Sequence, residues 1–378
     1  MSSPPIGVYV HWPWCARVCP YCDFNVRRDR GEEARKTALL EAMLNDLAVQ
    51  ASVAGPRRLV SIYLGGGTPS LMDPAQAERL VSAARRLWNC EDDIEVTLEA
   101  NPTDVEAARF ADFAAAGVTR VSLGIQSLRD PHLRFLGRNH NAAAARRAAE
   151  IAARTFRRLS IDLIYALPAQ DQADWAAELR EVVALGAEHL SAYQLTIEAG
   201  TAFSRAVARG ALVPPGEETA ADFFETTQRV LIEAGFHAYE VSNHARTPAA
   251  RSRHNLLYWR GEDYIGVGPG AHGRLTLLGQ RWELAAPRGI DAYITAAHRR
   301  PGRTRLEPKE AALERMLMGL RTDEGVSLQE LAPLAISRSK LETLARSGLA
   351  SIVDDRLIVG HQGRLVLDRI TLELAHGA

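Results

Sequence analysis

The chain has little net charge, few cysteines and no long apolar run. Acidic and basic side chains nearly cancel among its 378 residues, which gives a formal net charge of −1. Without an overall basic field, binding to nucleic acid or to an anionic membrane surface is not expected. No stretch is long and apolar enough to span a bilayer, and the first residues carry no basic segment followed by an apolar run. We therefore expect a soluble, cytoplasmic protein without membrane insertion.

Cysteine is scarce, and its distribution is uneven. Three of the four cysteines, Cys15, Cys19 and Cys22, fall within eight residues. Clustered thiols in a chain without a secretion signal indicate metal binding rather than a disulfide framework. A structural zinc normally needs four protein ligands and an ordinary [4Fe-4S] cluster needs four thiolates, so this loop leaves one metal position unfilled. A partial zinc site and three unrelated buried thiols are the alternatives. Cys90 stands apart and is expected to be a buried or half-buried small residue.

The first half of the chain alternates short β-branched runs with longer alanine-rich helical patterns. This alternation is typical of repeated βα units and a parallel sheet. We expect strands at residues 7–12, 59–64, 94–99, 120–126, 159–164 and 189–196. We expect helices between them at residues 33–51, 74–88, 104–115, 142–154 and 174–184. Six units are fewer than the eight of a closed barrel, so the prediction is an open, partial (β/α)6 TIM-like barrel whose C-terminal rim carries the chemistry.

Three domains are expected: the partial barrel at 1–200, a barrel extension at 201–305, and a C-terminal domain at 306–378. The extension contains an expected helix at 217–234, a glycine-rich aromatic segment at 258–273, and a connector with Arg299, Arg300, Arg303 and Arg305. We interpret that connector as a solvated linker, with contact to anionic ligand groups as the alternative.

The tail predicts helices at 308–320, 327–331 and 338–346, a hairpin around Asp354 and Asp355, and a last helix, an α+β order that resembles a winged helix. It contains 9 Lys and Arg against 11 Asp and Glu. This slightly acidic balance argues against DNA binding. We therefore interpret the tail as a lid or a docking module.

Polar residues and glycines stand where the predicted strands end. The second strand runs into Gly65, Gly66 and Gly67, where missing side chains let the backbone approach a ligand closely. The residues that we single out at this rim are Gly66, Gly67, Thr68, Glu99, Gln126, Arg138 and Asp162. A carboxylate suits an amino or hydroxyl donor, and an arginine fork suits a carboxylate. A salt bridge or a buried structural role is the alternative for each charged residue.

The C-x3-C-x2-C spacing of the three cysteines, with Phe24 two residues later, resembles the cluster loop of radical S-adenosylmethionine (SAM) proteins. The resemblance implies a [4Fe-4S] cluster whose fourth iron is chelated by the amino and carboxylate groups of SAM. It assigns Gly66, Gly67 and Thr68 to the methionine end of SAM. Glu99, Gln126, Arg138 and Asp162 match cofactor contacts of the oxygen-independent coproporphyrinogen III oxidase family and its relatives. Positions aligned more weakly with SAM are Tyr9, Tyr21, Phe24, Thr196 and His272.

Two departures from the oxidase pattern favour the related haem chaperones of the HemW type. Phe24 stands where the oxidase has a further cysteine, and only about six residues precede the first strand. Residues 19–24, Cys-Pro-Tyr-Cys-Asp-Phe, and residues 254–259, His-Asn-Leu-Leu-Tyr-Trp, both match patterns of these chaperones. Imidazole is a good axial ligand for haem iron. His254 is therefore the first candidate for haem contact and His244 a weaker one, with a hydrogen-bonded structural histidine as the alternative.

The resemblance implies a haem chaperone that binds haem, a [4Fe-4S] cluster and SAM, and that passes haem to an acceptor protein. An electron donor such as flavodoxin or ferredoxin is the other implied partner. The first alternative is a coproporphyrinogen III oxidase of porphyrin biosynthesis, so the sequence leaves open whether the protein is an enzyme. The second alternative is a degenerate barrel that serves only as an interaction scaffold.

Overall fold

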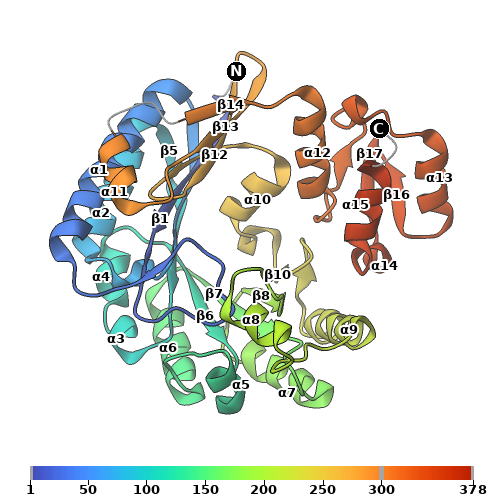
Figure 1. Ribbon diagram of the computed structural model, residues 1–378, viewed down its shortest axis with the longest axis horizontal. Coiled ribbons are helices and arrows are strands. Elements are labelled where there is room, and N and C mark those ends of the chain that lie inside the picture. The colour runs from blue at the N-terminus through green and yellow to red at the C-terminus, as the bar shows by residue number, and fades with distance from the viewer. Residues whose placement is uncertain (1–2, 298–301, 376–378) are drawn as a thin grey trace.

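The computed structural model describes residues 3–297 and 302–375, and its centre is a long, open sheet (Figure 1). The six predicted strands are all present, and each runs parallel to the next along the chain. They are β1 (Pro5–Trp12), β4 (Arg58–Gly66), β5 (Asn89–Ala100), β6 (Arg120–Gln126), β7 (Arg158–Tyr165) and β8 (His189–Gln194). The β5 strand begins five residues earlier than predicted, and Cys90 lies half-buried at its start.

Helices cover the outer face of this sheet (Figure 1). They are α1 (Glu33–Ala54), α2 (Pro74–Leu87), α4 (Phe110–Ala115), α6 (Ala142–Thr155) and α7 (Gln172–Val183). The single helix predicted at 104–115 is wrong, because the chain breaks into α3 (Asp104–Ala107) and α4. At the break Arg109 turns away and donates a 2.9 Å hydrogen bond to the carbonyl of Ser70. The short helix α5 (Asp130–Phe135) was not predicted.

Further strands extend the sheet at both ends without closing it. β11 (Asp263–Val267) runs parallel to β1, and β12 (His272–Leu277), β13 (Gln280–Ala285) and β14 (Gly302–Arg305) follow it in antiparallel order. At the other end β10 (Asn243–Ala245) and β9 (His237–Ala238) add to β8. Among the described residues the sheet has 12 strands, so the predicted open, partial barrel is confirmed.

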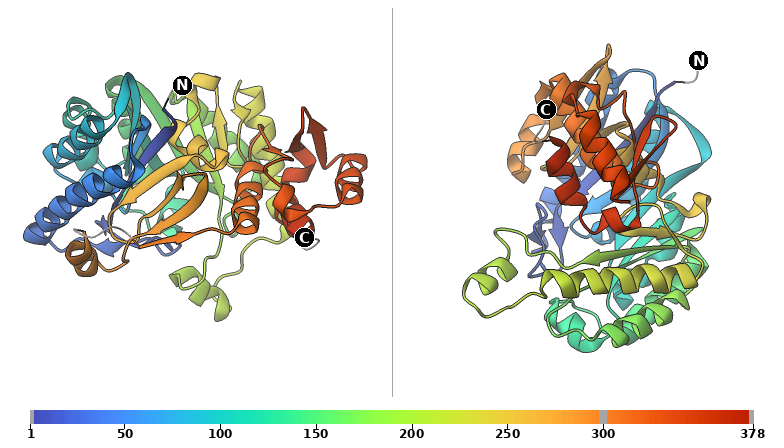
Figure 2. Two further views of the ribbon diagram at one scale, coloured as in Figure 1. Left: turned by 90° about the horizontal axis from the view of Figure 1, so that it is seen from above. Right: turned by 90° about the vertical axis from the view of Figure 1, so that its right-hand side faces the viewer.

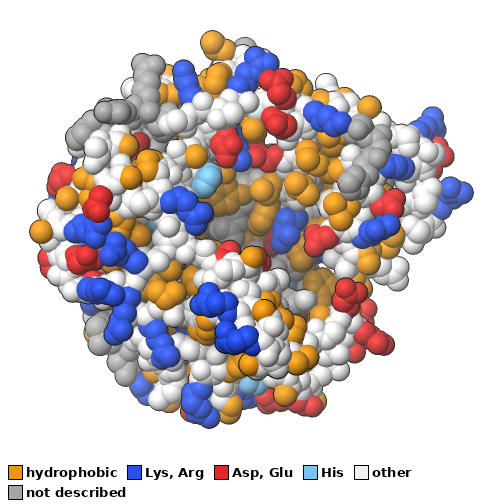
Figure 3. All heavy atoms as spheres, viewed as in Figure 1, with side chains coloured by type: hydrophobic (Ala, Val, Ile, Leu, Met, Phe, Trp, Pro, Cys, Tyr) orange, Lys and Arg blue, Asp and Glu red, His pale blue; other side chains and the backbone are white. Residues whose placement is uncertain are grey.

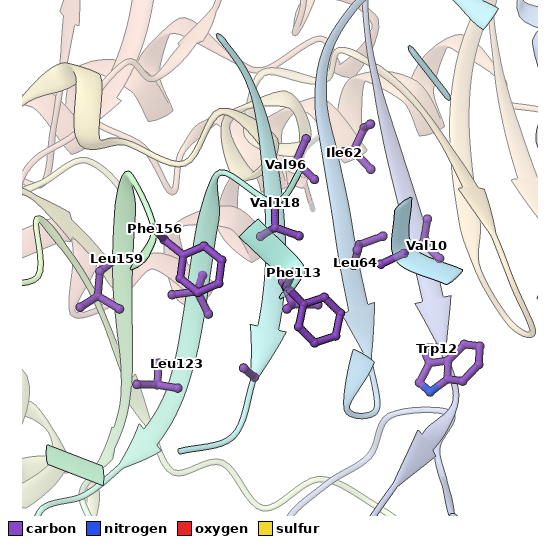
Figure 4. Close-up of a cluster of buried hydrophobic side chains, with 14 of the residues drawn as sticks. Val10, Trp12, Ile62, Leu64, Val96, Phe113, Val118, Leu123, Phe156 and Leu159 are labelled. Atoms are coloured by element: carbon purple, nitrogen blue, oxygen red, sulfur yellow. The ribbon is translucent and has the colours of Figure 1, made fainter. Parts of the chain in front are cut away.

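The two faces of the sheet differ in polarity. On β1 the side chains of Val8, Val10 and Trp12 are at most 1% exposed and face the helices. Figure 4 shows this apolar layer, to which Phe113 and Phe156 contribute from the helical side. Burying one such side chain contributes about 1.5–3 kcal/mol. Because side chains alternate along a strand, the intervening residues point into the barrel, where many of them are polar.

The barrel extension and its connector depart from the sequence-based interpretation. The helix predicted at 217–234 is present as α9 (Glu217–Glu233), preceded by α8 (Ala202–Ala208). The glycine-rich aromatic segment at 258–273 completes α10 (Arg253–Arg260) and forms β11. Arg303 and Arg305 belong to β14, so this part of the connector is a sheet strand rather than a linker. Arg299 and Arg300 lie outside the described residues. Helix α11 (Ile290–Ala296) precedes them.

The tail forms a small α+β unit beside the barrel (Figure 2). It contains α12 (Pro308–Gly319), β15 (Val326–Ser327), α13 (Arg338–Arg346), β16 (Ala350–Val353), β17 (Arg356–Val359), α14 (His361–Arg364) and α15 (Leu367–Ala375). The predicted hairpin is present, and Asp354 and Asp355 turn it with positive φ angles of 47° and 60°. The helix predicted at 327–331 is wrong, because Ser327 ends a strand that pairs with β17.

Ion pairs join the tail to the barrel extension. Arg251 lies 2.6 Å from Asp323, and Arg260 lies 2.6 Å from Glu324. Arg274 of β12 contacts Glu314 of α12 at 2.7 Å. None of the helices that the structure describes is long and apolar enough to cross a bilayer.

Candidate functional site

A cavity of about 650 Å³ occupies the inside of the partial barrel. The molecular surface is hollowed near its centre (Figure 3). Of the rim residues singled out from the sequence, the cavity is lined by Cys15, Cys19, Cys22, Tyr21, Phe24, Gly66, Gly67, Thr68, Glu99, Gln126, Arg138, Asp162 and Thr196. Segments from the first to the third quarter of the chain therefore converge on one cavity.

The cysteine loop is held closed by backbone hydrogen bonds. A short strand, β2 (Trp14–Cys15), pairs with β3 (Arg27–Arg28), and the Asp29 N–H donates to the Cys15 carbonyl at 2.8 Å. All three thiols are free, and Cys15 is buried while Cys19 and Cys22 are half-buried. Burial raises the pKa of Cys15 to about 12 and also raises the pKa of Cys22. The loop therefore keeps three thiols at the cavity. Burial favours the neutral thiol form of two of them, Cys15 and Cys22.

The arrangement of the thiols bears on the kind of metal site. In the described part of the chain, no three His, Cys, Asp or Glu side chains gather where they could hold one metal ion. A zinc ion needs its thiolates about 2.3 Å from one centre, so the zinc alternative gains no support from this geometry. A [4Fe-4S] cluster bonds each thiolate to a different iron and tolerates a wider spacing. The donor set and the open cavity beside it fit a cluster with one iron left for another chelator.

The glycine turn after β4 packs directly against the cysteine loop. The Gly67 N–H donates to the Trp12 carbonyl at 2.7 Å, and the Thr68 N–H donates to the Trp14 carbonyl at 2.8 Å. A Cβ atom on Gly67 would stand 2.6 Å from the Trp14 carbonyl oxygen and 3.0 Å from the Cys15 Sγ. Gly66 has a φ of +105°, a backbone conformation that residues with a side chain rarely adopt. Glycine is therefore required here for both conformation and space.

Glu99 closes β5 with its carboxylate at the rim. It accepts hydrogen bonds from the Tyr63 hydroxyl at 2.8 Å and from the Gly66 N–H at 3.2 Å. Burial raises the pKa of Glu99 to about 7, against the lowering effect of these two donors. The carboxylate has no arginine or lysine ion pair among the described residues. It is therefore a group that a cationic or hydrogen-bonding ligand would stabilise in its charged form.

Gln126 and Arg138 each bring an unpaired polar atom to the cavity. The Gln126 Oε1 and the Arg138 Nε are buried without a hydrogen-bond partner in the described structure. Gln126 also has a positive φ of 67°, a costly conformation for a residue with a side chain. The Arg138 guanidinium donates to the Gly124 carbonyl at 3.0 Å and lies 3.4 Å from the Cys19 Sγ. Unpaired buried atoms of this kind are costly, and a ligand that pairs with them offsets that cost.

Deeper in the barrel, the cavity wall is polar. Asp162 on β7 accepts a 2.9 Å hydrogen bond from Ser122 on β6, and burial raises its pKa. Arg120 begins β6, is only 2% exposed, and lines the same cavity. The partner that buried Asp162 requires is thus a neighbouring serine, supported by the charge of Arg120.

Tyr9 and His272 line a second cavity, also of about 650 Å³, beside the first. The two cavities share Asp23, Phe24, Gly66 and Glu99. The Tyr9 hydroxyl is 3.0 Å from the Nδ1 of His11. These two residues therefore line the neighbouring cavity, which shares Glu99 and Gly66 with the cavity of the cysteines.

The expectation that His254 contacts haem is not met by its surroundings. The side chain is 1% exposed and lines neither cavity. Its Nδ1 is 2.8 Å from the Ser61 hydroxyl and its Nε2 is 2.7 Å from the Tyr258 hydroxyl, so neither nitrogen is free for iron. Burial lowers its pKa to about 3. His244 is likewise fully buried, with its Nε2 3.2 Å from the Gln228 side chain. His254 therefore has no nitrogen free in this conformation, whereas the Nδ1 of His244 is buried without a hydrogen-bond partner in the described structure.

Replacing His254 with alanine is expected to lower the free energy of unfolding by about 2–4 kcal/mol, because it empties buried space and leaves the Ser61 and Tyr258 hydroxyls without a partner. Urea unfolding of the apoprotein measures the change. His237→Ala, at an exposed site, is the control and should cost little. A stable His254→Ala protein whose haem spectrum alone is altered would instead restore the role of His254 as a haem ligand.

Several cavity residues were missed from the sequence. They are Tyr63, Asn101, Arg120, Ser122, Ser191, Tyr193, Asn255 and Arg321. The signal that could have found most of them is a period of two: Arg120, Ser122 and Gly124 precede Gln126 by even numbers of residues on one strand. Arg321 comes from a distant segment and carries no such signal, and Asn255 lies in the segment 254–259, of which only His254 was singled out.

Comparison with known proteins gives the family. The model of the radical SAM superfamily matches residues 9–182, and that of the HemN C-terminal domain matches residues 306–366. The protein named heme chaperone HemW from Mycobacterium tuberculosis is 36% identical over 379 residues, covering 99% of this chain and 96% of that protein. The chain belongs to the HemW family of radical SAM proteins.

Other relatives match over 279 to 382 residues. The protein named heme chaperone HemW from Escherichia coli is 41% identical over 279 residues, covering 73% of this chain and 72% of that protein. Radical S-adenosyl methionine domain-containing protein 1, mitochondrial, from Danio rerio is 38% identical over 382 residues, covering 96% of this chain and 85% of that protein. Membership of the radical SAM superfamily implies SAM and a [4Fe-4S] cluster as cofactors.

The fold is shared with the coproporphyrinogen III oxidase HemN from Escherichia coli. The solved structure of that radical SAM enzyme superposes with a TM-score of 0.81 at 20% identity, covering 100% of this chain and 91% of that one. A match at 20% identity shows that the two proteins share a fold, including the C-terminal unit. It does not show that they share an activity.

Proposed function

We propose that this chain is a haem chaperone that holds a [4Fe-4S] cluster on Cys15, Cys19 and Cys22, binds SAM beside it, and passes haem to an acceptor protein. The observation that carries the proposal is a loop of three thiols that opens on a polar cavity, in a chain aligned almost end to end with a protein named as a haem chaperone. The cluster and SAM, when bound, supply the means to break a carbon–sulfur bond reductively.

The residues around the cavity have distinct roles in this proposal. Glu99 accepts a hydrogen bond from the amino group of SAM, and Arg138 offers its guanidinium to a carboxylate. Gln126 gives its unpaired Oε1 to a donor on the ligand. Gly66 and Gly67 let the ligand approach the backbone. The remaining proposed SAM contacts are Tyr9, Tyr21, Phe24, Thr68, Asp162 and Thr196.

Anaerobic reconstitution with iron and sulfide, followed by parallel titrations with SAM and haem, tests this proposal. We expect one cluster per chain, a cluster spectrum that changes when SAM is added, and saturable haem binding. Transfer is then measured by mixing the haem-loaded protein with an apo-haemoprotein and following the absorbance of the acceptor. Protein that carries a cluster but binds no haem would contradict the chaperone function.

An oxidase is the alternative function, which the resemblance of the sequence to the coproporphyrinogen III oxidase family leaves open. The reconstituted protein, supplied with a flavodoxin or ferredoxin as electron donor, is incubated with coproporphyrinogen III. A chaperone should give no decarboxylated product under conditions in which HemN, run in parallel, gives it. Rapid formation of protoporphyrinogen by this chain would reverse the choice.

The affinity for SAM is expected to decrease as the pH is lowered, because Glu99 becomes protonated. Its pKa of about 7 means that it is ionised above pH 7 and becomes protonated below it. If only the carboxylate accepts the amino group, affinity at pH 6 should be about tenfold lower than at pH 8. Isothermal titration from pH 6 to pH 8 measures this. Glu99→Gln removes the titrating group, so the difference between the two profiles cancels the titration of SAM itself; parallel profiles would rule out Glu99 as the contact.

A further inference from the structure

The second cavity has the character of a site for a flat, anionic ligand. It lies between β1, β11 and β12 on the barrel side and α10 and α12 on the other. Aromatic side chains form much of its wall: Phe24, Tyr258, Trp259 and Tyr264, with Met318 from the tail. The rings of Tyr258 and Tyr264 meet edge to face at 4.5 Å. Aromatic and thioether surfaces of this kind suit a planar macrocycle.

His272 is the histidine of this cavity that has a nitrogen free. Its side chain is 59% exposed, and its Nδ1 lies 3.6 Å from the Glu283 carboxylate. The Nε2 makes no hydrogen bond within the described residues. His11, which lines the same cavity, has both nitrogens occupied, by the Tyr9 hydroxyl and by the Asn25 carbonyl. A histidine that ligates a metal typically has a carboxylate near its other nitrogen, and Glu283 is such a neighbour of His272.

Three arginines, Arg274, Arg281 and Arg288, line the same cavity together with the acidic residues Asp23, Glu99 and Glu314. Arg274 and Arg281 are engaged by Glu314 and Asp263, at 2.7 and 2.8 Å. Arg288 is exposed and forms no ion pair with any residue that the structure describes. The indole N–H of Trp259 is buried without a hydrogen-bond partner in the described structure. An arginine without a partner and an unpaired donor beside one cavity favour a ligand with carboxylates.

We propose that haem binds in this second cavity, with the Nε2 of His272 as an axial ligand to the iron and Arg288 as the partner of a propionate. This inference rests on the proposed function, because it places the cargo of the chaperone. It also replaces His254 as the haem ligand, and it reassigns His272, which the resemblance aligns with positions that line SAM. Since Phe24, Gly66 and Glu99 belong to both cavities, haem would lie next to the SAM site and share a wall with it.

Titration of the full-length, anaerobically reconstituted protein with ferric haem tests this placement. The wild type should bind one haem, followed by its Soret band and electron paramagnetic resonance. His272→Ala should weaken binding at least tenfold and change the spin state, and added imidazole should restore the original spectrum. His272→Met should bind with a different ligand-field signature. Arg288→Gln should weaken binding several-fold while leaving the ligand field unchanged.

The controls distinguish a wrong haem site from a wrong function. His237→Ala, which removes an exposed histidine away from both cavities, should bind haem as the wild type does. A wild type that binds haem, with His272→Ala giving the same affinity and spectrum, would overturn the placement and leave the chaperone function standing. A wild type that binds no haem would overturn the proposed function itself. Thermal unfolding of each variant verifies that an exposed substitution at position 272 leaves the fold intact.

Discussion

Replacing Cys19 with serine is expected to abolish assembly of the iron–sulfur cluster. A serine hydroxyl is a poor substitute for a thiolate toward iron, and two remaining cysteines are too few to hold the cubane. Reconstituted wild type should contain about four iron atoms per chain, whereas the variant should contain almost none. Iron and sulfide assays, with electron paramagnetic resonance after reduction, measure the loss. SAM binding should fall with it.

The fold should survive this change, because Cys19 is half-buried and its side chain contacts only polar groups that the serine hydroxyl can also contact, those of Arg138, at 3.4 Å, and Tyr21 in the described structure. Cys90→Ser is the matched control: Cys90 lies on β5, lines neither cavity, and should leave the iron content unchanged. Full iron content in Cys19→Ser would remove the loop from the cluster site. One tightly bound zinc per wild-type chain would replace the cluster interpretation altogether.

The parallel core of the fold could be predicted because each of its strands has a signal in its own short stretch of sequence. Each of the six is a short β-branched run that ends at a turn, and consecutive strands pair in chain order. β11 could not be predicted in the same way. Its sequence, Asp-Tyr-Ile-Gly-Val, contains a glycine, and its partner β1 lies more than 250 residues away in the chain. Pairing at that distance is decided by the whole sheet and leaves little local signal.

The residues of the candidate site also differ in how far the sequence alone could predict them. The cysteines and the glycine turn were found because their chemistry depends on close spacing, and all of them line one cavity. The surroundings of His254 could not be predicted from its motif, because they are built by Ser61 on β4 and by the fold of α10. The role of a histidine depends on which of its nitrogens remain free, and that is a property of the packed structure.

Replacing Gly67 with alanine is expected to disrupt both the cluster and the SAM site. The added Cβ would lie 2.6 Å from the Trp14 carbonyl oxygen, 2.9 Å from the Trp12 carbonyl oxygen and 3.0 Å from the Cys15 Sγ. Backbone atoms cannot swing aside as a side-chain end can, so the turn and the cysteine loop must separate. We expect a stability loss of about 1–3 kcal/mol, typical of overpacking, and a SAM affinity lower by more than tenfold.

Gly302→Ala provides the matched control, because a Cβ there would meet its nearest neighbour, the Ala285 carbonyl oxygen, only at 3.9 Å. Its iron content, SAM affinity and unfolding free energy should stay near those of the wild type. In Gly67→Ala the same measurements should change together, since the two hydrogen bonds that join the turn to the loop, from Gly67 to Trp12 and from Thr68 to Trp14, would lengthen as the backbones part. Normal iron content with weakened SAM binding would mean that the loop holds its cluster independently of the turn. Retention of both would show that this contact between turn and loop is dispensable.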